Sequence, residues 1–137
     1  MAEVRNIPFI DLSLKKIDLE KTVSNISRLI KDKNFIGGEE VKKFQESFSK
    51  FNGSKYCLGV ANGTDALEIA LESLDIPKNS EVIVPNFTFL SPAEAVVRGG
   101  YKLVLADINL EDFTISLESL KRLINKNTSA LIVVHLF

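Results

Sequence analysis

The first third of the chain contains two stretches in which apolar residues recur every three or four positions. One begins behind Asp18, which has the character of a helix N-cap, and its apolar positions are Leu19, Val23, Ile26, Leu29 and Ile30. The other follows the loop 35–38, and its apolar positions are Val41, Phe44, Phe48 and Phe51. Asn52-Gly53 is a typical helix stop. The pattern predicts an N-terminal region, residues 1–53, with an extended lead-in at 7–12 and two amphipathic helices whose phenylalanine face packs in a core.

From residue 54 onward the pattern changes to short apolar runs separated by helix-forming segments. The predicted strands are 56–60, 81–84, 102–106 and 130–136. The predicted helices are 64–74, 91–98 and 116–124, the second with Pro92 in its first turn and Gly99-Gly100 as its stop. Regular alternation of strands and helices is the signature of βαβ units in a largely parallel sheet. Continuously apolar strands indicate that both faces of this sheet are covered.

The predicted fold class is therefore α/β, with helices packed on a mostly parallel sheet in the region 54–137, preceded by the two amphipathic helices. Ligands of such sheets bind at the carboxyl ends of the strands. These ends fall at residues 61–65, 85–89, 107 and 135–137.

The turn at Asn62-Gly63 lies between an apolar run and a helix that opens with Thr64 and Asp65. Such a turn directs unpaired backbone N–H groups and the positive end of a helix dipole at one spot, where an anion, usually a phosphate, binds. Gly63 permits close approach of the backbone, and Thr64 adds a hydroxyl donor. Asp65 would repel an anion unless it is turned away, so it ranks below Thr64. The alternative is a simple turn with a threonine cap that binds nothing.

Composition narrows the function classes. The chain has 137 residues, 45% of them apolar and 26% charged, which is ordinary for a globular protein. A net charge of −1 provides no electrostatic basis for binding nucleic acid or an anionic membrane. Cys57 is the sole cysteine, which fits a reducing, cytoplasmic setting. With one cysteine and one histidine, the chain lacks the ligands of a His/Cys metal site, so we predict no such site. No apolar run approaches the length of a membrane span.

Two segments carry a resemblance to a known family: Asn62–Leu67 (Asn-Gly-Thr-Asp-Ala-Leu) and Glu81–Phe89 (Glu-Val-Ile-Val-Pro-Asn-Phe-Thr-Phe). They resemble the DegT/DnrJ/EryC1/StrS family of sugar aminotransferases, which use pyridoxal 5′-phosphate (PLP) on the aspartate-aminotransferase fold (fold type I). Further segments that resemble the family are 7–12, 35–44, 99–108 and 134–136. The resemblance implies that region 54–137 is the N-terminal part of the PLP-binding large domain.

The resemblance also assigns roles to individual residues. Gly63 and Thr64, with Asp65 beside them, would hold the PLP phosphate. Phe89 matches the aromatic position that stacks on the pyridine ring, and an aromatic at a strand's carboxyl end suits a flat heterocycle; the alternative for Phe89 is a core residue. His135 is a possible cofactor contact, with a purely structural role as the alternative.

The residues that react with the cofactor are absent from these assignments. PLP transamination needs a Schiff-base lysine and an acidic residue against the pyridine nitrogen. In the family both follow the position of Phe137, and no lysine of this chain has the expected context, so we assign no catalytic residue here. The chain also stops on an apolar strand with no closing helix. We therefore expect an N-terminal fragment that is inactive by itself.

The function implied for the full-length protein is transfer of an amino group, from glutamate, to a nucleotide-linked keto-sugar for polysaccharide or glycoside synthesis. The resemblance implies a homodimer, to which the two N-terminal helices would contribute. One alternative is a PLP-dependent sugar dehydratase of the same family, in which histidine replaces the lysine. Another is that the chain is a non-catalytic truncated remnant.

Overall fold

The computed structural model describes residues 16–136, so the predicted lead-in at 7–12 lies outside the described residues. The chain divides into two compact units after Gly59. The sequence pattern had placed this boundary after Gly53.

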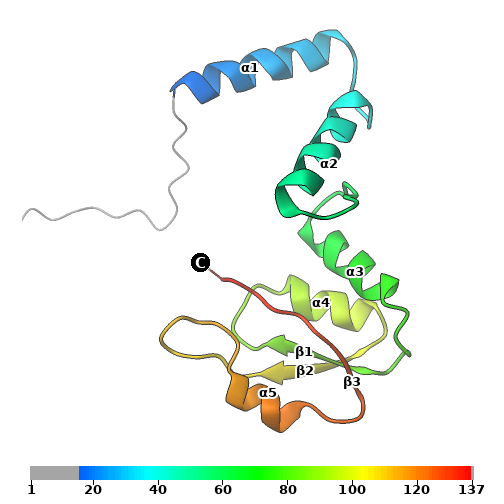
Figure 1. Cartoon of the computed structure of the whole chain (residues 1–137), viewed down its shortest axis with the longest axis vertical. Coiled ribbons are helices and arrows are strands. Elements are labelled where there is room, and N and C mark those ends of the chain that lie inside the picture. Colours follow the sequence, from blue (N-terminus) through cyan, green and yellow to red (C-terminus); the bar gives the residue numbers. More distant parts are fainter. Residues whose placement is uncertain (1–15, 137) are drawn as a thin grey trace, which may run out of the picture. The chain divides into compact units, whose positions relative to one another are not determined.

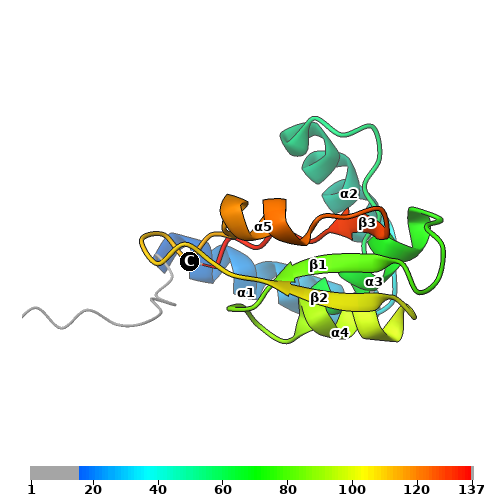
Figure 2. The ribbon, with the colours of Figure 1, turned by 90° about the horizontal axis from the view of Figure 1, so that it is seen from below.

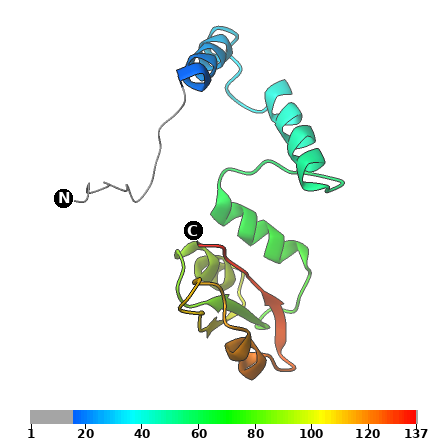
Figure 3. The ribbon, with the colours of Figure 1, turned by 60° about the vertical axis from the view of Figure 1, so that its left-hand side comes forward.

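The first unit contains two helices, α1 (Lys16–Lys31) and α2 (Glu39–Asn52), joined by a short loop (Figure 3). Both predicted helices are confirmed. Helix α1 begins before Asp18, so the prediction of Asp18 as N-cap was wrong. The Asp18 carboxylate lies in the first turn of the helix, where a negative charge interacts favourably with the helix dipole. The predicted stop of α2 is confirmed, because Gly53 adopts a left-handed conformation with φ 68° and donates its N–H to the carbonyls of Ser49 and Lys50.

The phenylalanine face of α2 does not pack in a core in the described part of the chain, contrary to the prediction. No residue of α2 is buried, and Phe44 is 58% exposed. The rings contact one another along the helix, with centroids 5.6 Å apart for Phe44 and Phe48 and 6.3 Å for Phe48 and Phe51. The helical spacing was correct, but no described element of this unit covers the stripe.

The strand predicted at 56–60 does not form, although the segment is apolar. Tyr56 is 78% exposed. A strand requires a neighbouring backbone to complete its hydrogen bonds. Here side chains serve instead: Gly59 donates its N–H to Oε1 of Gln45 at 2.9 Å, and Ser54 Oγ donates to the carbonyl of Tyr56 at 3.0 Å.

The second unit is built on a parallel sheet of three strands, β1 (Glu81–Pro85), β2 (Lys102–Ala106) and β3 (Thr128–Leu131), in the order β2-β1-β3 (Figure 1). The predictions for β1 and β2 are confirmed. The last strand begins and ends earlier than the predicted 130–136. The Ile132 N–H still donates to the Ile83 carbonyl at 2.9 Å, but Pro85, the next residue of β1 on that side, has no N–H to continue the ladder.

The core of this unit follows the alternation of β1 side chains, all of which are buried. Val82 and Val84 face α3 (Gly63–Ser73) and α4 (Ser91–Arg98), and their cluster includes Leu71, Ala95 and Val96. Ile83 points to the other face, where it packs with Ala106, Ile115 and Leu120 near α5 (Leu117–Leu123). Figure 2 shows α4 and α5 on opposite faces of β1 and β2. The α/β prediction with both sheet faces covered is confirmed.

Candidate functional site

The helices of the second unit begin at the carboxyl end of the sheet. A parallel sheet requires each connecting helix to run back against the strands, so helix N-termini gather where the strands end. The start of α3 and the start of α4 meet there: Thr64 Oγ1 lies 2.8 Å from Ser91 Oγ, and both side chains are half-buried. This is the edge at which the sequence predicted a site.

Helix α3 is capped by Asn62 and not by Thr64. Asn62 has an extended backbone, and its Oδ1 accepts the Asp65 N–H at 2.9 Å, while its carbonyl accepts the Ala66 N–H at 3.1 Å. Asn62 Nδ2 in turn donates to Oδ2 of Asp65 at 3.1 Å. The cap predicted in the alternative, Thr64, is therefore wrong, because Asn62 caps the helix. The sequence did contain a signal for the true cap, since an Asn followed three residues later by an acidic residue is close to a capping box.

This cap determines which donors at the start of α3 remain available. The Asp65 N–H is consumed by Asn62, and the Asp65 carboxylate is held back against the Asn62 amide. In the part of the chain that the structure describes, the N–H groups of Gly63 and Thr64 donate to no protein acceptor. They lie beside the positive end of a helix dipole, next to the Thr64 hydroxyl, which in this structure donates to Ser91 Oγ.

Gly63 is not required by the fold. Its φ lies outside the left-handed region, and a Cβ built on it would meet no atom within 4 Å. An alanine would fit and would favour the helix. The glycine instead leaves open space in front of the two unpaired N–H groups, which suits a ligand that approaches the backbone closely.

Ion pairs link α3 to α4 behind this point. Arg98 Nε lies 3.2 Å from Oε1 of Glu68 on α3, close enough for an ion pair although not aligned as a hydrogen bond. The same guanidinium reaches Glu94, one turn earlier on α4, at 3.4 Å. Because Arg98 is the last residue of α4 and its side chain is 60% exposed, these pairs link the end of α4 to the middle of α3 and contribute little to stability.

The other predicted site residues each follow a strand of the sheet in sequence. Phe89 follows β1 and is 76% exposed, so it is not a core residue in the described part of the chain. Its ring is therefore accessible to a planar ligand. Thr88 Oγ1 is shielded from solvent and has no hydrogen-bond partner among the described residues. His135 is exposed and lies beyond the end of β3, and no described hydrogen bond or ion pair joins it to the other candidates. Asp107, at the end of β2, accepts from Asn86 Nδ2 at 3.1 Å.

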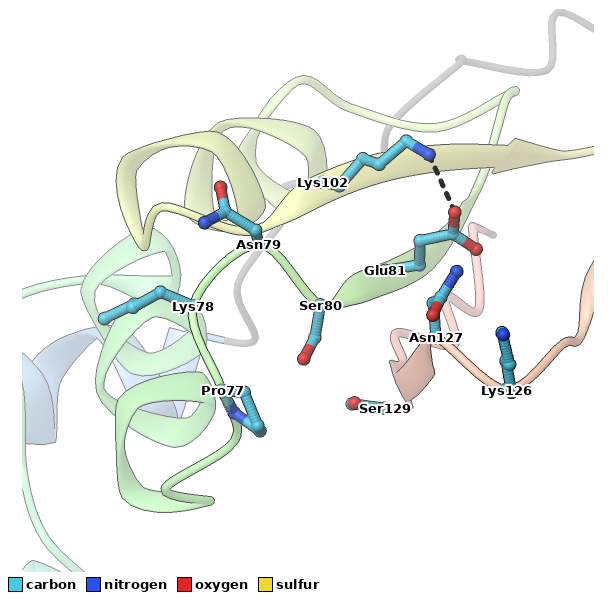
Figure 4. Close-up of a pocket in the computed structure, with 9 residues that line it drawn as sticks. All are labelled: Pro77, Lys78, Asn79, Ser80, Glu81, Lys102, Lys126, Asn127 and Ser129. Carbon is cyan, nitrogen blue, oxygen red and sulfur yellow. Dashed lines mark hydrogen bonds and ion pairs between the residues drawn. The ribbon is translucent and has the colours of Figure 1, made fainter.

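A cavity also opens at the opposite, amino end of the sheet (Figure 4). Its polar groups bind one another: Lys102 Nζ lies 2.8 Å from Oε1 of Glu81, whose Oε2 accepts from Asn125 Nδ2 at 2.7 Å. The Lys102 ammonium, and then the Asn125 amide, lower the pKa of Glu81. Lys78 is likewise committed, to Glu72 at 2.9 Å. Glu81, Lys102 and Lys78 of this cavity's lining thus already have protein partners, whereas no described hydrogen bond or ion pair joins the Lys126 side chain to another residue.

Comparison with known proteins decides the family. The model of the DegT/DnrJ/EryC1/StrS aminotransferase family matches residues 16–137. The chain belongs to this family.

The DegT/DnrJ/EryC1/StrS relatives include sugar aminotransferases and dehydratases. The chain is 36% identical over 132 residues to the UDP-2-acetamido-2-deoxy-3-oxo-D-glucuronate aminotransferase of Pseudomonas aeruginosa, covering 96% of this chain and 37% of that protein. It matches the Bacillus subtilis protein NtdA, solved with the cofactor PMP bound, with TM-score 0.84 and 25% identity, covering 98% of this chain and 32% of the other. It also matches the E. coli GDP-4-keto-6-deoxy-D-mannose-3-dehydratase, solved with bound hydrated PLP, with TM-score 0.79 and 25% identity. This match covers 93% of this chain and 33% of the dehydratase. The chain thus spans about a third of the length of its relatives.

The part of the chain that the structure describes contains neither a metal-binding cluster nor a membrane-spanning helix. No group of three or more His, Cys, Asp or Glu side chains there is placed to hold a metal ion. None of the described helices has both the length and the apolar character needed to cross a membrane.

Proposed function

We propose that this DegT/DnrJ/EryC1/StrS chain supplies the phosphate-binding and ring-stacking part of a PLP-dependent aminotransferase that acts on a nucleotide-linked keto-sugar. The observation that carries the proposal is the pair of unpaired N–H groups of Gly63 and Thr64 at the start of α3, in a chain whose family match covers residues 16–137. Glutamate is the proposed amino donor.

The donor set fits the phosphate of PLP. Two backbone N–H groups, one hydroxyl and a helix N-terminus are the groups that bind a phosphate dianion in other folds. Gly63 leaves the space for it. Asp65, predicted beside the phosphate, is proposed to act indirectly: its carboxylate stays bound to Asn62 and is thereby kept from repelling the anion.

Phe89 is proposed to hold the pyridine ring. Its exposed side chain follows β1 at the same edge of the sheet as Thr64 and Ser91. Offset stacking of an aromatic ring on a heterocycle contributes on the order of 1 kcal/mol beyond the buried area. His135 stays a possible contact only.

The bound cofactor would supply the electron sink that makes the amino-bearing carbon of a substrate acidic. The chain's own residues would hold the phosphate, orient the ring and exclude water from one side of it. We propose that the reacting lysine and the carboxylate against the pyridine nitrogen belong to sequence that follows the position of Phe137. The exposed apolar stripes of α1 and α2 support the proposal of a homodimer, because such stripes require a cover.

The test uses the complete purified protein with its cofactor. Addition of L-glutamate is expected to convert the cofactor's absorbance from its aldehyde form to its amine form. Subsequent addition of a dTDP- or UDP-linked keto-sugar is expected to restore it and to yield an amino-sugar, detected by mass spectrometry. Absence of any response to glutamate would sink the aminotransferase proposal.

A second candidate, sugar dehydration, is favoured by the match to the E. coli dehydratase. The same mass measurement separates the two. The product of such a dehydratase has a C–H in place of one sugar hydroxyl, keeps its carbonyl and carries no new nitrogen, because the nitrogen of the amine-form cofactor leaves as ammonia. An aminotransferase product keeps its hydroxyls and carries an amino group in place of the carbonyl oxygen.

A further inference from the structure

The Thr64–Ser91 hydrogen bond joins the starts of two helices and involves a residue that the sequence singled out only as a helix start. Thr64 lies in the first turn of α3, and Ser91 is the first residue of α4. In the structure Thr64 Oγ1 donates to Ser91 Oγ at 2.8 Å, between half-buried side chains, where hydrogen bonds are stronger than in open solvent.

Helix α4 has few other donors to offer at this point. Pro92, in its first turn, has no N–H, and the Glu94 N–H already donates to the Leu90 carbonyl at 3.0 Å. Among the described residues, the Thr64–Ser91 bond is the hydrogen bond that joins the start of α4 to the start of α3.

The proton count of this pair limits what it can do. Two hydroxyls carry two protons, and the bond between them uses one, which leaves one O–H for an outside acceptor. A phosphate dianion only accepts. If Thr64 is to donate to a phosphate in front of its own N–H group, the Thr64 oxygen must receive its hydrogen bond from Ser91. Hydroxyl rotation makes this exchange of direction cheap.

We infer that Ser91 is a positioning residue for the cofactor phosphate: it donates to Thr64 Oγ1, fixes the rotamer of Thr64, and turns the Thr64 O–H toward the phosphate. This inference rests on the proposed function of Gly63 and Thr64 as the PLP phosphate site. Ser91 acts through Thr64 and does not itself bind the phosphate.

The test compares affinities for PLP and for pyridoxal, which lacks the phosphate, in the complete cofactor-free protein. Ser91→Ala is expected to raise the Kd for PLP about three- to tenfold, as for loss of one hydrogen bond, and to leave the Kd for pyridoxal unchanged. Ser91→Thr retains the hydroxyl and is expected to restore PLP affinity. The matched control is Ser73→Ala, an exposed serine near the other end of α3, which is expected to change neither Kd.

A double-mutant cycle separates positioning from direct binding. In a Thr64→Val background, Ser91→Ala is expected to have no further effect on the Kd for PLP, and the 31P signal of the bound phosphate should be the same in the single Thr64→Val and double variants. A further loss in that background would show that Ser91 binds the phosphate directly and would overturn the inference. Equal losses for PLP and pyridoxal would also overturn it, because they would indicate a general disturbance of α4.

Failure of the proposed function has a different signature. If Thr64→Val leaves PLP affinity unchanged, the start of α3 is not the phosphate site, and the inference falls with it. If Thr64→Val weakens PLP binding but Ser91→Ala does not, the proposed site stands and only the role of Ser91 is lost.

Discussion

The two ends of the same parallel sheet differ in how their polar groups are used. At the amino end, Glu81 is bound by Lys102 and Asn125, so its carboxylate is satisfied within the protein. At the carboxyl end, the N–H groups of Gly63 and Thr64 have no protein acceptor among the described residues. The amino end shows a cavity with partly paired charges, whereas the carboxyl end shows the backbone donors without a protein acceptor.

This difference separates a structural cavity from a binding site. Gly63 is exposed and Thr64 is half-buried, so a ligand can reach both N–H groups without breaking a bond within the protein. A cavity lined by groups that already bind one another gives a ligand only the chance to break existing bonds. We therefore expect substitutions at the carboxyl end of the sheet to change cofactor affinity, and substitutions at the amino end to change the stability of the fold.

The largest effect is expected from Gly63→Asp in the complete protein. The added carboxylate would lie in front of the proposed phosphate donors, and repulsion between close charges near a protein surface amounts to a few kcal/mol. We expect the Kd for PLP to rise about a hundredfold or more. Stability measured by urea unfolding of the cofactor-free protein should be unchanged or slightly higher, because an acidic residue in a first helical turn is favourable.

Gly63→Ala is the control for size alone. Its Cβ meets no protein atom, so the cofactor-free fold should accept it, and any loss of PLP affinity would report contact with the cofactor itself. If Gly63→Asp bound PLP as tightly as the unaltered protein, the assignment of this edge as the phosphate site would be wrong.

A smaller effect is expected from Asn62→Ala, which removes the cap of α3. Loss of an N-cap acceptor costs about 1 kcal/mol of unfolding free energy. The substitution also frees the Asp65 carboxylate, so PLP affinity should fall together with stability. Asn62→Ser retains an acceptor for the Asp65 N–H but lacks the Nδ2 donor. It should therefore recover stability while PLP binding stays weak, and recovery of both would show that Asp65 needs no restraint.

Most of the second unit was predictable because local pattern and tertiary position agree there. The apolar run at 81–84 and the run at 102–106 became paired strands, and Ser116 caps α5 by accepting the Ser119 N–H at 3.3 Å. The carboxyl edge was also predicted correctly, although 56–60 forms no strand: α3 runs back along the sheet before β1, so its start lies at the same end as the loop 85–89.

The errors arose where one segment depends on another that is distant in sequence. The run at 56–60 has strand composition, but a strand requires a neighbour, and Gly59 bonds to Gln45 instead. The Phe stripe of α2 has core spacing, but spacing does not state what covers it. The Thr64–Ser91 bond links residues 27 apart, and no local pattern signals such a pairing.

The smallest expected effect belongs to the amino end and depends on pH. Bonds from Lys102 and Asn125 lower the pKa of Glu81 in the folded state. A carboxylate whose folded pKa is depressed contributes stability above its unfolded value, about 4.3, and loses that contribution as pH falls through the folded pKa. Glu81→Gln should therefore be less stable than the unaltered protein at pH 7, with a difference that shrinks toward pH 3.

Urea unfolding at pH 7, 5 and 3 measures this pH dependence, with Glu111→Gln as a control, since Glu111 is an exposed loop carboxylate with no described hydrogen bond or ion pair. PLP affinity at pH 7 should be the same for all three proteins. A Glu81→Gln variant that bound PLP poorly while keeping its stability would reverse the assignment of the two ends, because it would make the Glu81–Lys102 pair part of a ligand site. A variant that lost stability equally at pH 7 and pH 3 would show instead that the shape of Glu81, and not its charge, closes the amino end of the sheet.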